Sequence, residues 1–241
     1  MGGFVGKLFS SSPNEPRILQ LPNTRVQIVK KIGTGGFATV FLVKDQSRPD
    51  KFLALKRFEC LNDETRVQFA QTEINTLKKL SAASDHIIKL IDTDERAFVL
   101  LPFYDKGSIQ SIVDKERKIK NIEPYIVISG LFTKSEILQI SLDICDAIRI
   151  FHENGLSHRD IAPGNILIYV DDNNKRRGVL MDFGSTAPAK VDTSAYANCV
   201  KLQELAESTC SALYRAPELY EVFADSLIDG SGDIWVNSFE I

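Results

Sequence analysis

Three oxygen-bearing side chains in the second half of the chain have types and positions that suit phosphoryl transfer. Asp160 and Asn165 come just before the apolar run Ile166–Val170, and Asp182 follows a second apolar run, Val179–Met181. Amide and carboxylate oxygens are hard ligands suited to Mg²⁺, so Asn165 and Asp182 are candidate metal ligands. Asp160 is the candidate base that accepts the proton of an attacking hydroxyl.

A glycine-rich segment in the first half could contact phosphate groups. Gly33, Gly35 and Gly36 follow a predicted strand, and glycines let backbone N–H groups approach phosphate oxygens closely. This segment by itself also fits an ordinary tight hairpin. A Rossmann dinucleotide site would need a helix directly after the loop, whereas another strand is expected here.

A lysine and a glutamate form the second phosphate-handling feature. Lys56 lies in the predicted strand Phe52–Phe58, and Glu73 lies on the helix predicted next. The ammonium group of Lys56 can neutralise phosphate charge if a carboxylate holds it in place. Glu73 is adjacent to the apolar stripe of its helix, so an ion pair is plausible, with a solvated glutamate as the alternative. The apolar positions of that helix are Val67, Ala70, Ile74 and Leu77.

The elements that must position these groups change in kind along the chain. The first half is rich in strands, predicted at Val26–Ile32, Thr39–Lys44, Phe52–Phe58 and Ala97–Leu101. The second half begins with a capping box, Thr133 and Glu136, and a long helix whose face is traced by Ile137, Ser141, Ile144, Ile148 and Phe151. Residues 1–24 contain Ser and Pro punctuation and are predicted to be a tail.

Composition narrows the class of protein. The 241 residues carry a formal net charge of -3, which gives no reason to expect a nucleic-acid partner. An apolar fraction of 44% is typical of a soluble globular protein. The scattered cysteines, Cys60, Cys145, Cys199 and Cys210, indicate reduced intracellular thiols. We therefore expect a cytoplasmic protein, since no apolar run reaches the roughly 18 residues that cross a bilayer.

Taken together, these segments resemble the protein-kinase signature set, over roughly residues 25 to 235. The matching features are the glycine loop, Lys56, Glu73, His158–Asp160, Asp182–Gly184 and Ala216–Glu218. The resemblance implies an α+β, bilobal kinase fold that uses ATP and Mg²⁺ and phosphorylates a protein substrate. The lobes it implies are an N-lobe at 25–101, a hinge at 102–105 and a C-lobe at 106–241.

The resemblance also implies a role for each matching residue. Asp160 would be the catalytic base, Lys56 would hold the phosphates and Glu73 would orient Lys56, while Asn165 and Asp182 would bind Mg²⁺. The residues expected to bind the nucleotide are Ile32, Gly33, Gly35, Val40, Ala54, Lys56, Leu101, Phe103 and Tyr104.

Two residues near the substrate position indicate specificity and regulation. Ser211 occupies the position at which Ser/Thr-directed kinases present a hydroxyl toward the catalytic aspartate, so serine/threonine specificity is favoured. Arg159 could pair with a phosphate placed on the activation segment, the stretch from Asp182 to Ala216.

Finer details resemble the numb-associated kinases, and most of all their acylated, Golgi-associated Ser/Thr member. The segments that carry this likeness are Leu100–Tyr104, Leu180–Ser185 and Val200–Glu207. That group has an extra helix late in the activation segment. The resemblance to this member also implies acylation of Gly2 and peripheral contact with a Golgi or endosomal membrane. Gly6, however, stands where the acylation pattern usually has Ser or Thr.

Two departures from the kinase pattern leave alternatives open. Ala162 replaces a lysine that lies near the transferred phosphoryl group, which suggests a weakly active enzyme or a non-catalytic nucleotide-binding scaffold. The helix that begins near Asp233 breaks its pattern after Trp235, so we expect a C-lobe that lacks its last helices. A small-molecule phosphotransferase is a third hypothesis, which Ala216–Glu218 and the long activation segment disfavour.

Overall fold

The computed structural model describes residues 18–59, 63–120 and 130–237, which form two compact units. The first unit contains the chain up to Lys78 together with Lys89–Phe103, and the second contains Lys79–Ile88 and the chain from Tyr104 onward. The predicted hinge, residues 102–105, contains the boundary between Phe103 and Tyr104. The segment Lys79–Ile88 belongs to the second unit, although the prediction assigned it to the N-lobe.

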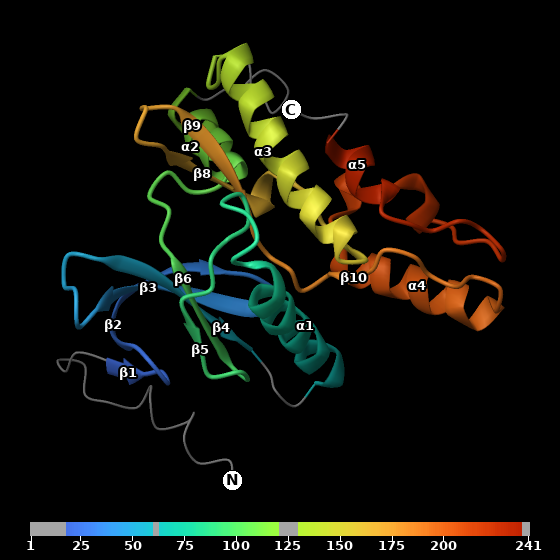
Figure 1. The fold of residues 1–241 in the computed structure, drawn as a ribbon, viewed down its shortest axis with the longest axis horizontal. Coiled ribbons are helices and arrows are strands. Elements are labelled where there is room, and N and C mark those ends of the chain that lie inside the picture. Colours follow the sequence, from blue (N-terminus) through green and yellow to red (C-terminus); the bar gives the residue numbers. More distant parts are fainter. Residues whose placement is uncertain (1–17, 60–62, 121–129, 238–241) are drawn as a thin grey trace, which may run out of the picture. The chain divides into compact units, whose positions relative to one another are not determined.

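The first unit is built on an antiparallel sheet of six strands in the order β1-β2-β3-β4-β6-β5 (Figure 1). The strands are β1 Ile18–Gln20, β2 Arg25–Thr34, β3 Ala38–Asp45, β4 Phe52–Phe58, β5 Asp92–Thr93 and β6 Phe98–Pro102. Buried side chains that include Val43, Leu53, Leu55 and Leu100 form its core. Their alternation along each strand follows from the two-residue period of side-chain direction.

Strand β1 corrects the predicted end of the N-terminal tail. Residues Ile18–Gln20 pair with β2, and the side chains of Leu19 and Leu21 are buried in the core of this unit. The serines and prolines before and after this stretch suggested a tail, but the apolar residues between them bury enough surface to form an edge strand. Residues 1–17, including Gly2, lie outside the described part of the chain.

Helix α1, Glu64–Leu80, is the helix predicted to carry Glu73. Ala70, Ile74 and Leu77 are buried, as the helical spacing predicts, whereas Val67 is 41% exposed. The buried stripe therefore begins one turn later than expected.

The second unit is mainly helical, with two small sheets (Figure 1). Its helices are α2 Ile109–Lys120, α3 Lys134–Glu153, α4 Tyr196–Thr209 and α5 Ser231–Asn237. Strands β8 Ile166–Val170 and β9 Arg176–Leu180 pair with each other, as do β7 Leu156–Ser157 and β10 Ala187–Pro188. Single 3₁₀ turns lie at Pro163–Asn165, Ala212–Tyr214 and Pro217–Leu219.

The N-terminus of α3 has the predicted capping box. The Thr133 side chain accepts from the Glu136 backbone N–H, and Glu136 Oε2 accepts from the Thr133 N–H at 2.7 Å. Burial along the helix differs in part from the prediction, because Ile137 and Ser141 are only half-buried. The buried positions are Ile140, Asp143, Ile144, Ala147, Ile148 and Phe151.

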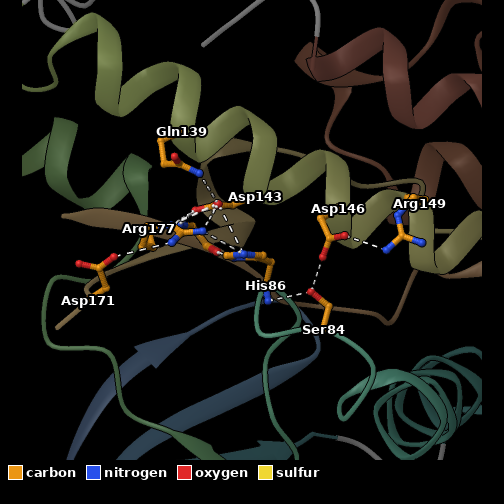
Figure 2. Close-up of polar contacts among 9 residues, drawn as sticks. Ser84, His86, Gln139, Asp143, Asp146, Arg149, Asp171 and Arg177 are labelled. Carbon is orange, nitrogen blue, oxygen red and sulfur yellow. Dashed lines mark hydrogen bonds and ion pairs between the residues drawn. The ribbon is translucent and has the colours of Figure 1, made fainter. Parts of the chain in front are cut away.

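Asp143 is a buried carboxylate on this face of α3, with a side chain only 2% exposed (Figure 2). Arg177 donates three bonds to it, from Nη2 to Oδ1 at 2.7 Å and from Nε to Oδ2 at 2.9 Å and to Oδ1 at 3.2 Å. The Gly178 N–H and the Gln139 side chain donate two more. Burial raises the pKa of the Asp143 carboxyl, but these hydrogen bonds outweigh burial and leave the pKa below its ordinary value.

We expect Asp143→Asn to destabilise the protein at neutral pH by about 3 kcal/mol, because it breaks a buried ion pair. A lowered folded-state pKa contributes stability above the unfolded value of 3.8, and this contribution is lost as the pH falls through the folded pKa. The difference in unfolding free energy between wild type and variant should therefore shrink between pH 6 and pH 3. Urea unfolding at both pH values measures it, and a constant difference would contradict the lowered pKa.

Candidate active-site residues

The register of the first unit's sheet brings five of the predicted nucleotide-binding residues onto one face. Gly33 pairs with Val40, and Val40 pairs with Lys56, so these three positions form one row across β2, β3 and β4. Ala54 lies two residues from Lys56 on β4 and pairs with Leu101 on β6. Directly opposed residues and those two apart on a strand share a face. The backbone therefore places all five positions on the same side.

Lys56 and Glu73 form the predicted ion pair. The Lys56 Nζ lies 2.7 Å from both carboxylate oxygens of Glu73. The Glu73 side chain is 2% exposed, so the alternative of a solvated glutamate is wrong. A carboxylate buried in this way requires a cation, and it holds the ammonium group in one place on the sheet.

The glycines between β2 and β3 are not required by the packing of the described residues. A Cβ at Gly35 would lie 3.9 Å from the Ala38 carbonyl oxygen, and one at Gly36 would meet no described atom within 4 Å. Neither glycine has a positive φ. Their absence of side chains instead leaves bare backbone, which suits close approach of a phosphate.

We therefore expect Gly35→Ala to weaken ATP binding without loss of stability. The added methyl group fits the fold and restricts the unfolded chain, so the melting temperature should stay the same or rise slightly. The KM for ATP should rise about tenfold, which corresponds to about 1.4 kcal/mol of lost contact. Steady-state kinetics and a thermal melt measure both quantities. An unchanged KM would show that ATP does not approach this loop.

Asp160 lies on the loop between β7 and β8, with its carboxylate held on both sides. Its Oδ1 accepts from the Ser211 N–H at 2.8 Å, and its Oδ2 accepts from Asn165 Nδ2 at 2.8 Å. Each carboxylate oxygen has two lone pairs. The described residues thus orient the Asp160 carboxylate and leave it lone pairs that can take up the proton of a substrate hydroxyl.

Asn165 and Asp182, the predicted metal ligands, are joined through the backbone. The Met181 N–H donates to the Asn165 carbonyl oxygen at 2.9 Å, next to Asp182. Both side-chain bonds of Asn165 to described residues use Nδ2, so its amide oxygen Oδ1 stays available. The described residues contain no cluster of three or more His, Cys, Asp or Glu that could hold a metal. One carboxylate and one amide oxygen nonetheless suit Mg²⁺, which usually takes few protein ligands and completes its shell with water and phosphate.

The sequence places Asp233 only at the beginning of a helix and does not predict it as a site residue. The residue is 1% exposed, and its carboxylate accepts from the N–H groups of His158 and Arg159, from Ser157 Oγ, and from His152. Burial raises the pKa of this carboxyl, but the hydrogen bonds and the nearby histidines lower it below its ordinary value overall. Asp233 thus holds the backbone just before Asp160.

Arg159 adopts a strained backbone conformation, with φ at 65°. The Asp233 bond to its N–H helps to maintain this conformation. Its side chain donates to the Pro188 carbonyl oxygen at 3.0 Å, and burial lowers the pKa of the guanidinium. Its predicted pairing with a phosphate stays a prediction.

Ser211 contacts the predicted base through its backbone. We expected its hydroxyl to face Asp160, but the bond that reaches the carboxylate comes from the Ser211 N–H. Ser185 Oγ donates to the Thr209 carbonyl oxygen at 2.8 Å and ties the start of the activation segment to the last residue of α4. The buried Ala162 side chain provides no cation in this region.

The predicted hinge residues differ in burial. Leu101 is buried, whereas Phe103 and Tyr104 are half-buried. Burial raises the pKa of Tyr104 to about 12, with smaller contributions from Tyr169 and Asp85. That these residues and Ile32 bind the nucleotide stays a prediction.

Comparison with known proteins identifies the class. Residues 26–238 match the family model described as "Protein kinase domain". This match covers most of the chain, so the protein belongs to the protein kinase family, and the predicted α+β kinase fold is confirmed. Members of this family generally use ATP and Mg²⁺ and act on protein substrates.

Curated relatives narrow the class further. A probable serine/threonine-protein kinase of Dictyostelium discoideum is 29% identical over 96% of this chain and 78% of its own length. Serine/threonine-protein kinase 16 of Homo sapiens is 30% identical over 89% of this chain and 67% of its own length. Together with the family match, these relatives show that the chain is a serine/threonine-protein kinase. They do not favour the alternative of a non-catalytic scaffold.

No helix in the described ranges combines the length and apolar character that a membrane span requires.

Proposed function

We propose that this chain transfers the γ-phosphoryl group of ATP to serine or threonine hydroxyls of a protein, with Asp160 as the base. The observation that carries the proposal is the Asp160 carboxylate, held by the Ser211 N–H and Asn165 Nδ2 at 2.8 Å each. A base whose position is set by two donors is oriented before the substrate arrives. Its remaining lone pairs accept the proton of the attacking hydroxyl.

The other residues act on charge and position. Lys56 neutralises phosphate charge, and Glu73 keeps its ammonium group in place. Asn165 Oδ1 and the Asp182 carboxylate are the metal ligands in this proposal. When bound, Mg²⁺ offsets the negative charge that the phosphates carry. The glycine loop leaves its backbone open to the phosphates, as the space around Gly35 and Gly36 supports.

In this proposal the turnover of the enzyme is low because Ala162 stands where a lysine would supply a positive charge. Loss of one preorganised charge near the reacting group lowers turnover by about 10²- to 10³-fold. The test is phosphate transfer from ATP to Ser, Thr and Tyr peptides and to small metabolites, by wild type and by Ala162→Lys. We expect slow transfer to Ser and Thr peptides that the variant accelerates about 10²-fold. Transfer to metabolites only, or to no acceptor by either protein, would overturn the proposal.

We also propose membership of the numb-associated group and peripheral membrane contact through Gly2. Helix α4, Tyr196–Thr209, lies late in the activation segment, where that group is expected to have an extra helix. Mass spectrometry of the chain from a eukaryotic host would test acylation of Gly2. Co-sedimentation with phosphatidylcholine vesicles would test membrane contact, with Gly2→Ala as the control.

A further inference from the structure

The segment Ser84–Ile88, which follows α1, lies along the end of β9. The Leu180 N–H donates to the His86 carbonyl oxygen at 2.8 Å, and the Ile88 N–H donates to the Leu180 carbonyl oxygen at 3.0 Å. Ile87 and Leu180 form an isolated parallel bridge. Both backbone groups of Leu180 are therefore bonded to this segment, two residues before Asp182.

The His86 side chain extends the same contact along β9 (Figure 2). Its Nδ1 lies 3.0 Å from the Gly178 carbonyl oxygen, and its Nε2 lies 3.2 Å from Arg177 Nη2. A carbonyl oxygen can only accept, and a guanidinium can only donate. The Nδ1–H group of His86 therefore donates to the Gly178 carbonyl oxygen, and Nε2 also lies 3.5 Å from Asp143 Oδ1.

Arg177 in turn forms ion pairs with two carboxylates from different parts of the second unit. Asp143 on α3 accepts from its Nε and Nη2, and Asp171, just after β8, lies 3.7 Å from its Nη1. The Ser84 hydroxyl donates to Asp146 on the same helix at 2.6 Å. As Figure 2 shows, Arg177 on β9 thus contacts both α3, through Asp143, and the segment that follows α1, through His86.

Asp182 needs such support because its backbone is strained. Its φ is 67°, a left-handed conformation that a non-glycine residue adopts at a cost. Such a strained conformation persists only when several contacts of the neighbouring residues hold it in place. Before it, Leu180 and Met181 are bonded to His86, Ile88 and Asn165. After it, Phe183 is fully buried against the rings of Phe151 and His158.

We propose that His86, with Arg177 and Asp143, is a positioning residue for the reaction: it holds the end of β9 so that the Asp182 carboxylate is presented to the metal. This inference rests on the proposed role of Asp182 as a metal ligand. Breaking a buried ion pair by removing one partner is costly, but the intact pair adds little net stability compared with well-packed apolar residues in its place. A role in placing Asp182 accounts for such a polar cluster better than stability does.

The experiment compares two substitutions of His86 in the full chain. His86→Leu removes the contacts of both ring nitrogens, whereas His86→Asn keeps an N–H donor near the position of Nδ1 and loses the contacts of Nε2 with Arg177 and Asp143. Leu19→Ala serves as a control for lost stability, because Leu19 is buried in the core of the other unit. Lys120→Gln serves as a second control, since the ion pair of Lys120 in the described part of the chain is with Glu116 on α2, away from β9.

Two readouts separate positioning from general stability. The first is amide hydrogen exchange of residues Leu180 to Phe183 without nucleotide. The second is the Mg²⁺ midpoint, which is the Mg²⁺ concentration that gives half of the maximal effect. It is measured in two assays at saturating ATP, one on the rise in melting temperature and one on kinase activity. For His86→Leu we expect about tenfold faster exchange and about a tenfold higher Mg²⁺ midpoint in both assays. The KM for the peptide should stay unchanged, and His86→Asn should restore part of each effect.

Either of two results overturns the inference. One is a Mg²⁺ midpoint for His86→Leu equal to that of wild type, and the other is an equal shift in Leu19→Ala, which would indicate stability alone. Asp182→Asn distinguishes this failure from failure of the proposed function. If Asp182→Asn loses Mg²⁺ dependence while His86→Leu does not, the metal role of Asp182 stands and only the role of His86 is wrong.

Discussion

Replacing Asp160 by asparagine should lower kcat by about 10²- to 10⁴-fold, the usual contribution of a positioned base. The side chain keeps its shape but can no longer take up the proton of the substrate hydroxyl. Its two present partners, the Ser211 N–H and Asn165 Nδ2, are both donors. An amide can accept both only through one oxygen, so one of these bonds is also lost.

The measurement is steady-state transfer to a Ser peptide, together with the KM for ATP, which should change little because Asp160 does not bind the nucleotide in this proposal. Asp192→Asn is the matched control, since Asp192 is an exposed carboxylate bonded to Ser194 in the activation segment. A kcat for Asp160→Asn within threefold of wild type would exclude Asp160 as the base.

Asp182 should give the second large effect, with opposite consequences for activity and stability. Asp182→Gly removes the metal-binding carboxylate and relieves the strain of φ at 67°. We expect phosphate transfer to fall about 10³-fold or more, because a bound metal supplies several kcal/mol of charge stabilisation. The unfolding free energy should rise by roughly 1 kcal/mol, which is the lower end of the cost of such strain.

Asp182→Asn separates these two effects, because asparagine tolerates the left-handed region and removes only the charge. It should lose activity as Asp182→Gly does, with a melting temperature close to that of wild type. Residual activity above a tenth of the wild-type value in both variants would contradict the metal role of Asp182. A lower melting temperature for Asp182→Gly would contradict the strain.

Local patterns in the sequence determined the elements and the class of chemistry. The two-residue and helical periods of apolar residues predicted β3, β4 and the buried stripe of α1, because side-chain direction follows backbone geometry over a few residues. The capping box at Thr133 is local for the same reason, since its two partners lie within one turn. The residue types at Lys56, Asp160 and Asp182 indicated phosphoryl transfer, because few side chains can bind phosphate, take a proton or ligate Mg²⁺.

Only the tertiary structure decided which atoms meet across long stretches of chain. Asp233 binds the backbone of His158 and Arg159 from more than 70 residues away, and the Ser211 N–H reaches Asp160 across 51 residues. The contacts of His86 with Gly178 and Arg177 cross 92 and 91 residues. No local period encodes such pairs, because they form when packing brings buried donors and acceptors together and leaving either one unpaired is costly.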